Sequence, residues 1–126
     1  MNLIEIFSII VIHWIADFVM QDEKWALGKS KNWKDLLSHT MTYSFMWIVG
    51  LGLFIPTLMA LPLFYFVIIT FICHTTTDYF TSRVVSKRFT DKYLGGPIPN
   101  FGAFSIIGFD QVLHYVQLFI TYQLLL

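Results

Sequence analysis

The sequence predicts an all-α protein: a polytopic membrane bundle of four transmembrane helices that forms a single domain over residues 1–126. Three observations predict this fold class. Hydrophobic residues make up 56% of the chain and charged residues only 13%, whereas about 25% of the residues in a soluble domain are charged. Four apolar segments are long enough to cross a bilayer, and every lysine and arginine lies between them in two loops.

The four apolar segments have roughly the twenty residues that a helix needs to cross the hydrocarbon layer. They cover about residues 3–20, 36–55, 61–82 and 104–125. The first segment lacks a basic start and a small-residue cleavage site, and it contains His13 and Asp17. We therefore interpret it as a retained transmembrane helix and not as a signal peptide. Pro56 and Pro62 bound a short connection, which makes the second and third helices an antiparallel pair.

Two longer stretches separate the other helices. The stretch from Asp22 to Asp35 mixes charged residues with tryptophans, so we expect it to lie among the lipid headgroups, with a break at Gly28. The stretch 93–100 contains two glycines and two prolines and cannot continue a helix. We interpret Gly95–Asn100 as a connecting turn, with a lid as the alternative.

The basic residues predict the orientation of the bundle. Lys24, Lys29, Lys31 and Lys34 follow the first helix, and Arg83, Lys87, Arg88 and Lys92 follow the third. Because cytoplasmic loops are enriched in lysine and arginine, these two loops should be cytoplasmic and both termini outside. The expected location is the cytoplasmic (inner) membrane, with the lipid bilayer as partner. Zero net charge indicates no nucleic-acid partner, the single Cys73 excludes an internal disulfide, and no motif decides whether the bundle forms a homo-oligomer.

Seven ionisable residues lie inside the predicted helices at a repeated spacing. Three pairs are four residues apart, which places both members on one helix face, and a single histidine begins the second helix. All seven lie within two or three turns of the predicted cytoplasmic ends, so the topology gathers them in one layer near that face. They are His13 with Asp17, His74 with Asp78, Asp110 with His114, and His39.

This His/Asp layer has the ligand chemistry of a metal site. Imidazole and carboxylate bind zinc and similar divalent ions, and the layer as predicted contains three acids without a basic partner. We therefore predict that all seven residues bind two divalent metal ions, zinc or alternatively manganese or iron. Asp17, Asp78 and Asp110 would hold the metal-bound water that acts in catalysis. Gln21 and Gln111 flank the layer and could orient the ligands, although interhelical hydrogen bonding is an equal alternative.

A metal-dependent hydrolase is the function that this pattern favours. A metal-bound water would attack a phosphoester or similar bond in an anionic small molecule or lipid at the cytoplasmic leaflet. Lys24, Arg83 and Arg88 are near the mouth of the site and could attract such a substrate, but membrane orientation already explains them. Two alternatives remain open. One is a proton- or metal-handling transporter, and the other is a non-catalytic membrane interaction protein with a structural metal site.

Several motifs resemble a known family. The chain is similar to bacterial and phage membrane proteins catalogued as domain of unknown function 3307. The similar residues are His13-Trp-Ile-Ala-Asp17-Phe-Val-Met-Gln21, Trp25, Lys29, Leu36-Leu-Ser-His39, His74-Thr-Thr-Thr-Asp78 and Phe109-Asp110-Gln111-Val-Leu-His114. That resemblance implies no activity. The layout also resembles, more loosely, inner-membrane metal-dependent hydrolases of the LexA-regulated type, which are akin to zinc phospholipase C and P1-type nucleases. This second resemblance implies that the same seven residues are metal ligands.

Overall fold

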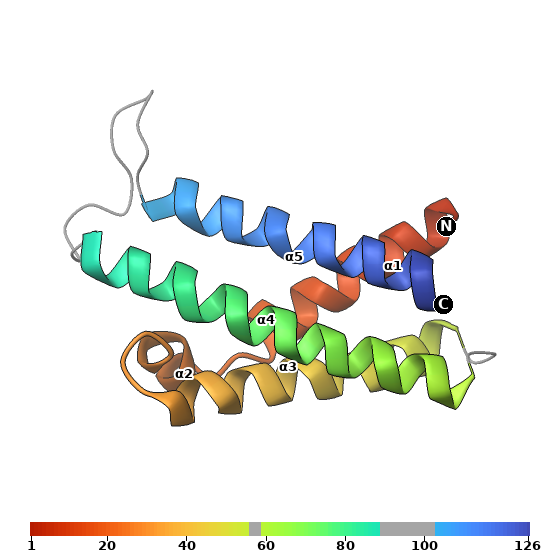
Figure 1. Cartoon of the computed structure of the whole chain (residues 1–126), viewed down its shortest axis with the longest axis horizontal. Helices are drawn as coiled ribbons and strands as arrows, with labels where there is room; N and C mark the ends of the chain where they lie inside the picture. The colour runs from red at the N-terminus through yellow and green to blue at the C-terminus, as the bar shows by residue number, and fades with distance from the viewer. Residues whose placement is uncertain (56–58, 89–102) are drawn as a thin grey trace.

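The structure, a computed structural model, describes residues 1–55, 59–88 and 103–126 (Figure 1). Every regular element in these ranges is a helix, which confirms the all-α prediction for the described part of the chain. The elements are α1 (Leu3–Trp14), a π-helical turn η1 (Ile15–Val19), α2 (Glu23–Gly28), α3 (Trp33–Phe54), α4 (Ala60–Arg88) and α5 (Ala103–Leu125). The expected turn at Pro56 and the expected loop Gly95–Asn100 lie outside the described residues.

The prediction of four membrane-spanning helices is wrong. Among the described residues, a single helical stretch, Ala60–Ser86 of α4, is long and apolar enough to cross a membrane, and one such helix is weak support for any span. The first predicted span fails because α1 has only 12 residues before it passes into the 5-residue turn η1. Helices α3 and α5 have sufficient length, with 22 and 23 residues, but polar residues such as Asp35, Ser44 and Gln117 interrupt their apolar sequence.

The long helices form a bundle in which each contacts two others. Helix α4 packs against both α3 and α5, and α1 contacts α3 and α5 from the other side. Both termini lie at one end of this bundle, whereas α2 lies at the opposite end beside the start of α3 (Figure 1). The bundle interior therefore receives side chains from every long helix.

The interior is divided along its length into an apolar part and a polar part. Toward the termini, the core contains Ile9, Trp47, Leu51, Phe66 and Leu118, all of which are almost fully buried. Toward α2, the largest group of buried polar residues consists of histidines and aspartates. The packed apolar core adjoins these groups and fixes the helices that carry them, while two buried threonines, Thr70 and Thr121, lie on the apolar side.

The π-helical turn changes the direction of the chain where α1 meets this polar part. The backbone N–H of Met20 donates to the carbonyl of Ile15 at 2.9 Å, five residues earlier, in place of the usual four. Such a bulge widens one turn of a helix and is frequent at functional sites. Asp17 lies in the middle of η1 and is buried. The turn therefore sets the position of one aspartate of the polar part.

Helix α2 and the start of α3 form a compact corner. The side chain of Asn32 accepts from the backbone N–H of Asp35 at 2.8 Å and caps α3, and its amide donates to the Asp35 carboxylate at 2.7 Å. Gly28 ends α2, as the sequence predicted for the break in this stretch. A Cβ at Gly28 would collide with the Asp35 side chain, so only glycine permits this approach.

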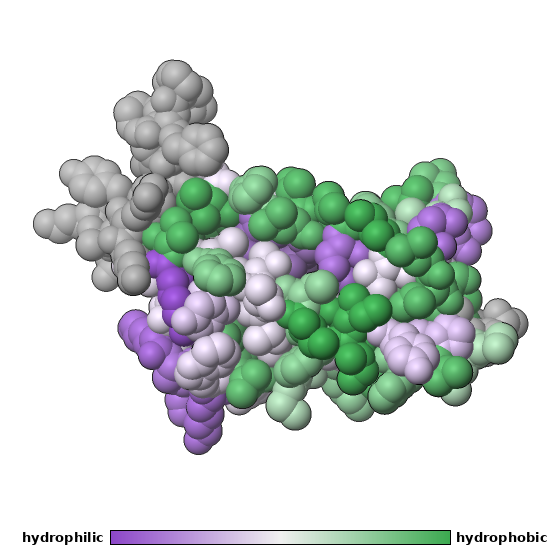
Figure 2. Space-filling view, viewed as in Figure 1, coloured by the Kyte–Doolittle hydropathy of each residue, from purple (hydrophilic) through white to green (hydrophobic). Residues whose placement is uncertain are grey.

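The outer surface of the bundle is strongly apolar. Phe45, Phe80 and Val116 are half or more exposed, and similar side chains surround them. Figure 2 shows apolar residues over much of the middle of one face, with hydrophilic residues at the end where α2 lies and another hydrophilic group at the end of the termini. The described helices therefore expose more apolar surface than the scattered single side chains of an ordinary protein surface.

Candidate metal centre

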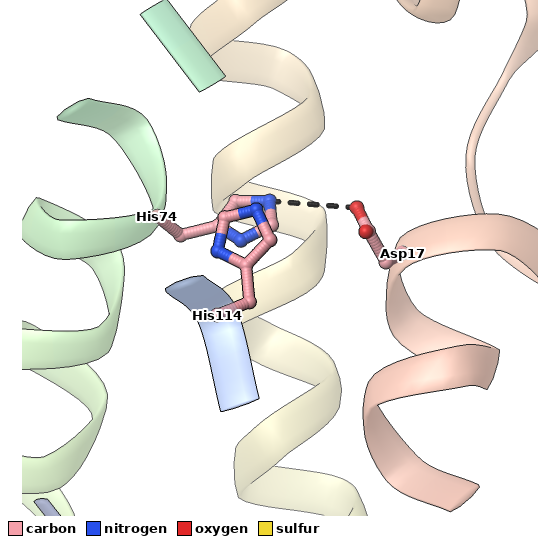
Figure 3. Close-up of side chains that lie close together, drawn as sticks. All are labelled: Asp17, His74 and His114. Atoms are coloured by element: carbon pink, nitrogen blue, oxygen red, sulfur yellow. Dashed lines mark ion pairs between the residues drawn. The ribbon is translucent and has the colours of Figure 1, made fainter. Parts of the chain in front are cut away.

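Six buried side chains from four elements converge in the polar part of the interior. They are Asp17 of η1, His39 of α3, His74 and Asp78 of α4, and Asp110 and His114 of α5, and none is more than 7% exposed. Figure 3 shows Asp17 facing the rings of His74 and His114 from the opposite side. We refer to these residues as the six-residue cluster.

The ligand atoms of the cluster form three overlapping groups. Within each group, one nitrogen or oxygen atom of every residue lies within 4.8 Å of the others. The groups are Asp17 with His74 and His114, His39 with His74 and Asp78, and Asp78 with Asp110 and His114. Because His74, Asp78 and His114 each belong to two groups, neighbouring cation positions would share ligands.

Individual distances show how close these atoms are. Oδ1 of Asp17 lies 3.1 Å from Nε2 of His39 and 3.5 Å from Nε2 of His74. Nε2 of His114 lies 3.4 Å from Oδ1 of Asp78 and 3.3 Å from Oδ2 of Asp110. The Nε2 atoms of all three histidines therefore face carboxylate oxygens, as they would around a shared cation.

Ring stacking holds two of the histidines in place. The ring of His74 lies between those of Tyr43 and His114, with centroid distances of 3.7 and 4.1 Å. The ring planes of Tyr43 and His74 differ by only 10°. Tyr43 is fully buried, so its ring fixes the orientation of His74.

The cluster fits a divalent cation. Buried polar atoms are normally hydrogen-bonded, yet Oδ1 of Asp78 and Nε2 of His114, which lie 3.4 Å apart, form no hydrogen bond of acceptable geometry among the described residues. Two imidazole nitrogens, those of His39 and His74, also lie only 3.2 Å apart. Nitrogen and carboxylate donors of this kind suit zinc and related ions. The residues present are therefore able to hold such an ion.

His13 lies beside the cluster and belongs to none of the three groups. Its Nδ1 is 2.7 Å from the Tyr43 hydroxyl, and its Nε2 is 2.7 Å from Oε1 of Gln111. Since Oε1 can only accept, Nε2 must carry the proton, and the neutral ring then accepts from Tyr43 at Nδ1. Both nitrogens of His13 are occupied by these bonds, so the structure does not place it among the converging ligand atoms.

Gln111 is hydrogen-bonded to His13 and to two aspartates, whereas no hydrogen bond among the described residues joins Gln21 to the cluster. The Gln111 amide donates to Asp17 and to Asp110, both at 3.1 Å. These bonds fit both alternatives that the sequence left open for Gln111, orientation of ligands and interhelical hydrogen bonding. Oε1 of Gln21 is buried without a partner among the described residues, and Gln21 lines a neighbouring pocket.

Lys29 brings a positive charge into the cluster. Its Nζ lies 2.9 Å from Oδ2 of Asp78, and its side chain is 20% exposed. Burial opposes the charge, but the carboxylates of Asp78 and Asp17 outweigh burial and raise the pKa of Lys29 above its ordinary value. The expectation that the three acids have no basic partner is therefore wrong, because a loop residue reaches into their layer.

Of the three basic residues predicted to attract a substrate, Lys24 and Arg83 do not line the pocket beside the cluster. Lys24 is exposed and does not line the pocket beside the cluster. The guanidinium of Arg83 lies 3.6 Å from the Tyr79 ring centroid and donates to the Tyr79 carbonyl at 2.9 Å, so it is held on α4. Arg88 is the last residue of α4, and its side chain lies outside what the structure describes.

Sequence reasoning also missed Tyr43 and Thr81. The Thr81 hydroxyl donates to Oδ1 of Asp110 at 2.6 Å. Helical spacing contained a signal for both residues, because Tyr43 follows His39 by four positions and Thr81 follows Asp78 by three. Helical spacing gave no such signal for Lys29, since it lies between helices, although Lys29 is one of the residues that carry the family resemblance.

An open pocket of about 520 Å³ adjoins the cluster. Asp17, Asp110 and Gln111 form its inner wall, and Lys29 and Lys31 also line it. The rest of its lining combines serine, threonine and glutamine side chains with apolar residues that include Phe18, Leu27, Val85, Ile106 and Ile107. The described elements leave this opening because the backbones of η1 and α2 pack against α3 and not against α4 or α5. A molecule entering the pocket would reach two of the three cluster aspartates.

Together, the fold and the site define a helical bundle with a buried His/Asp cluster that is able to bind a metal ion. The chain belongs to the family described as protein of unknown function DUF3307, whose model matches residues 6–126. This match confirms the family resemblance found in the motifs. No match to the chain was found among curated proteins or among solved structures. The family description assigns no activity.

Proposed function

We propose that this protein is a metal-dependent hydrolase that cleaves phosphoesters at the six-residue cluster. One observation carries the proposal: ligand atoms from four elements converge in three groups directly beside an open pocket. A purely structural cluster would need no such opening. The shared lining residues Asp17 and Asp110 connect the candidate metal position to the place where a substrate would bind.

The reaction adds water across a P–O ester bond. The water oxygen bonds to phosphorus, the ester oxygen leaves, and a proton from water ends on the leaving oxygen. A divalent cation bound here would lower the pKa of a water molecule and stabilise negative charge on the phosphoryl group. Asp17 and Asp110 lie between cluster and pocket, where their carboxylates are able to accept a proton from the attacking water.

The pocket favours an anionic substrate that also has an apolar part. The Lys29 ammonium and the Gln21 amide offer hydrogen bonds to phosphate oxygens near the cluster. The apolar side of the pocket, formed by residues such as Val85 and Ile107, would exclude water from a hydrocarbon group. A wholly polar phosphoester would leave that wall without a favourable contact.

We further propose that the protein acts at a membrane. The observation that supports this location is the extent of apolar surface around the bundle, together with the length and apolarity of the Ala60–Ser86 stretch. Cell fractionation tests the location directly. A protein found in the soluble fraction without detergent would overturn it.

Elemental analysis of the purified chain tests the metal centre, in parallel with a His74→Ala/Asp78→Ala variant. We expect a stoichiometric divalent metal in the natural protein and its loss in the variant, because each of these residues belongs to at least one ligand group. The same samples are then assayed with bis(4-nitrophenyl) phosphate. A folded protein without metal, or a metal-loaded protein without phosphoesterase activity that the variant lacks, would contradict the proposed function.

A further inference from the structure

Lys29 lies outside the helix pairs from which the sequence predicted the site, yet its ammonium reaches the cluster. We propose that its ammonium is a built-in second cation of the centre, so that the six-residue cluster takes one divalent metal ion and not two. This inference rests on the metal centre of the proposed function, and it specifies the number of ions and their position.

The charge balance supports one ion. Asp17, Asp78 and Asp110 together contribute three negative charges, and the Lys29 ammonium contributes one positive charge, which leaves a net charge of −2. One divalent cation neutralises that charge when the histidines are neutral ligands. A second divalent cation would produce a buried excess of positive charge beside Lys29, which is costly in a low-dielectric interior.

The two carboxylate oxygens of Asp78 face different neighbours. Oδ2 lies 2.9 Å from the Lys29 Nζ and 3.2 Å from Nε2 of His39. Oδ1 lies 3.4 Å from Nε2 of His114 and has no hydrogen-bond partner among the described residues. The ammonium is therefore on the side of the group His39–His74–Asp78, and the opposite side of Asp78 is available.

The metal ion accordingly belongs to the group Asp78–Asp110–His114. Its ligand atoms lie within 4.8 Å of one another, and Thr81 and Gln111 hold the Asp110 carboxylate from outside. That group also adjoins the pocket through Asp110. The ion would thus be next to the substrate, while Lys29 neutralises the remaining part of the cluster.

The backbone around Lys29 holds the ammonium at this place. Lys29 is the C-cap of α2, and its N–H donates to the carbonyl of Trp25 at 2.8 Å. The preceding residue, Gly28, is in close contact with Asp35 at the start of α3. Because α2 packs on α3 through this corner, the backbone of Lys29 is held at a position from which its side chain reaches Asp78.

Metal content measured by inductively coupled plasma mass spectrometry tests the inference on the full-length protein after reconstitution with zinc. We expect one zinc ion per chain in the natural protein and in Lys29→Arg, which keeps the charge. Lys29→Met removes the charge and should raise the content to two, because His39, His74 and Asp78 then form an unoccupied ligand group. Lys24→Met, at an exposed residue away from the pocket, is the matched control and should hold one ion.

Each result decides a different point. Two zinc ions in the natural protein, or one in a folded Lys29→Met variant, would overturn the role of Lys29 and leave the metal centre intact. No zinc in the natural protein would overturn both the metal centre and this inference. If Lys29→Met does not fold, manganese reconstitution of the natural protein decides: a six-line spectrum of isolated Mn²⁺ in electron paramagnetic resonance supports one ion, and an exchange-coupled spectrum refutes it.

Discussion

Oε1 of Gln111 lies 2.7 Å from Nε2 of His13, while the amide nitrogen of the same side chain donates to Asp17. These bonds fix the amide orientation, because a carboxylate can only accept and the amide must therefore present its N–H groups to it. The fixed amide in turn fixes the tautomer of His13. A single glutamine thereby connects a buried histidine on α1 with carboxylates on η1 and α5.

Replacing Gln111 by leucine should weaken metal binding without unfolding the bundle. The substitution removes two hydrogen bonds that orient the carboxylates of Asp17 and Asp110. Loss of such supporting contacts typically reduces metal affinity by about 10- to 100-fold. Competition with a zinc-binding dye measures the affinity. Gln117→Leu is the control, since Gln117 bonds to Thr70 and Thr121 on the apolar side, and an equal loss of affinity in that variant would contradict the role of Gln111.

The Tyr43 hydroxyl should contribute to stability separately from the Tyr43 ring. Tyr43→Phe keeps the ring that stacks on His74 and removes the donor to Nδ1 of His13, which leaves a buried acceptor unsatisfied. We expect a loss of about 1–3 kcal/mol in the free energy of unfolding with metal content unchanged. Urea denaturation followed by circular dichroism gives the first quantity, and elemental analysis gives the second.

Tyr43→Leu provides the contrast, because it removes the ring as well. Metal content should fall in this variant, since His74 loses the surface that holds its orientation. If Tyr43→Phe lost as much metal as Tyr43→Leu, the hydroxyl and not the stacked ring would be the important group.

The sequence predicted the site more accurately than it predicted the membrane topology. Pairs such as His74 with Asp78 were found from helical spacing alone, because residues four apart share a face in any α-helix. The assignment of His13 to the same ligand layer used that rule as well. Its two nitrogens, however, are taken by Tyr43 and Gln111, which come from helices remote in sequence and have no fixed spacing to His13.

The prediction of a membrane-spanning first helix was wrong for a local reason. A continuous apolar segment over residues 3–20 reads as one α-helix, but the backbone changes to π-helical hydrogen bonding at Ile15. No residue there is a glycine or proline, so composition gives no signal for the change. The contact between Lys29 and Asp78 was not predicted for a different reason. Lys29 lies in a loop, and it approaches the buried carboxylate only because α2 packs on α3.

The length of a substrate's alkyl chain should affect the rate of hydrolysis. We expect dodecyl 4-nitrophenyl phosphate to be cleaved with a kcat/KM at least ten-fold above that of the butyl ester, because burial of each methylene is worth about 0.8 kcal/mol and only some of the extra methylenes need to contact the pocket. Val85→Ser places a hydroxyl in the apolar lining and should reduce this preference. The release of 4-nitrophenol measures both esters.

Val112→Ser controls for the effect of detergent micelles on the longer ester. Val112 is 54% exposed on α5 and does not line the pocket, so this variant should keep the full preference. A preference that is equal in Val85→Ser and Val112→Ser would show that the micelle and not the pocket selects the long chain.

Two glycines of α3 should respond in opposite directions to alanine. A Cβ at Gly50 would lie 2.8 and 2.9 Å from the Cγ atoms of Ile12, a buried β-branched residue that has little freedom to move. Overpacking of this kind costs about 1–3 kcal/mol, which exceeds the helix-propensity gain of about 0.5–1 kcal/mol. Gly50→Ala should therefore destabilise the bundle.

At Gly52, a Cβ would meet nothing within 4 Å, so Gly52→Ala should stabilise the bundle by the propensity gain alone. Thermal unfolding of the two variants measures the difference, and a higher Tm for Gly50→Ala than for the natural protein would contradict the close approach of α1 and α3 at this point.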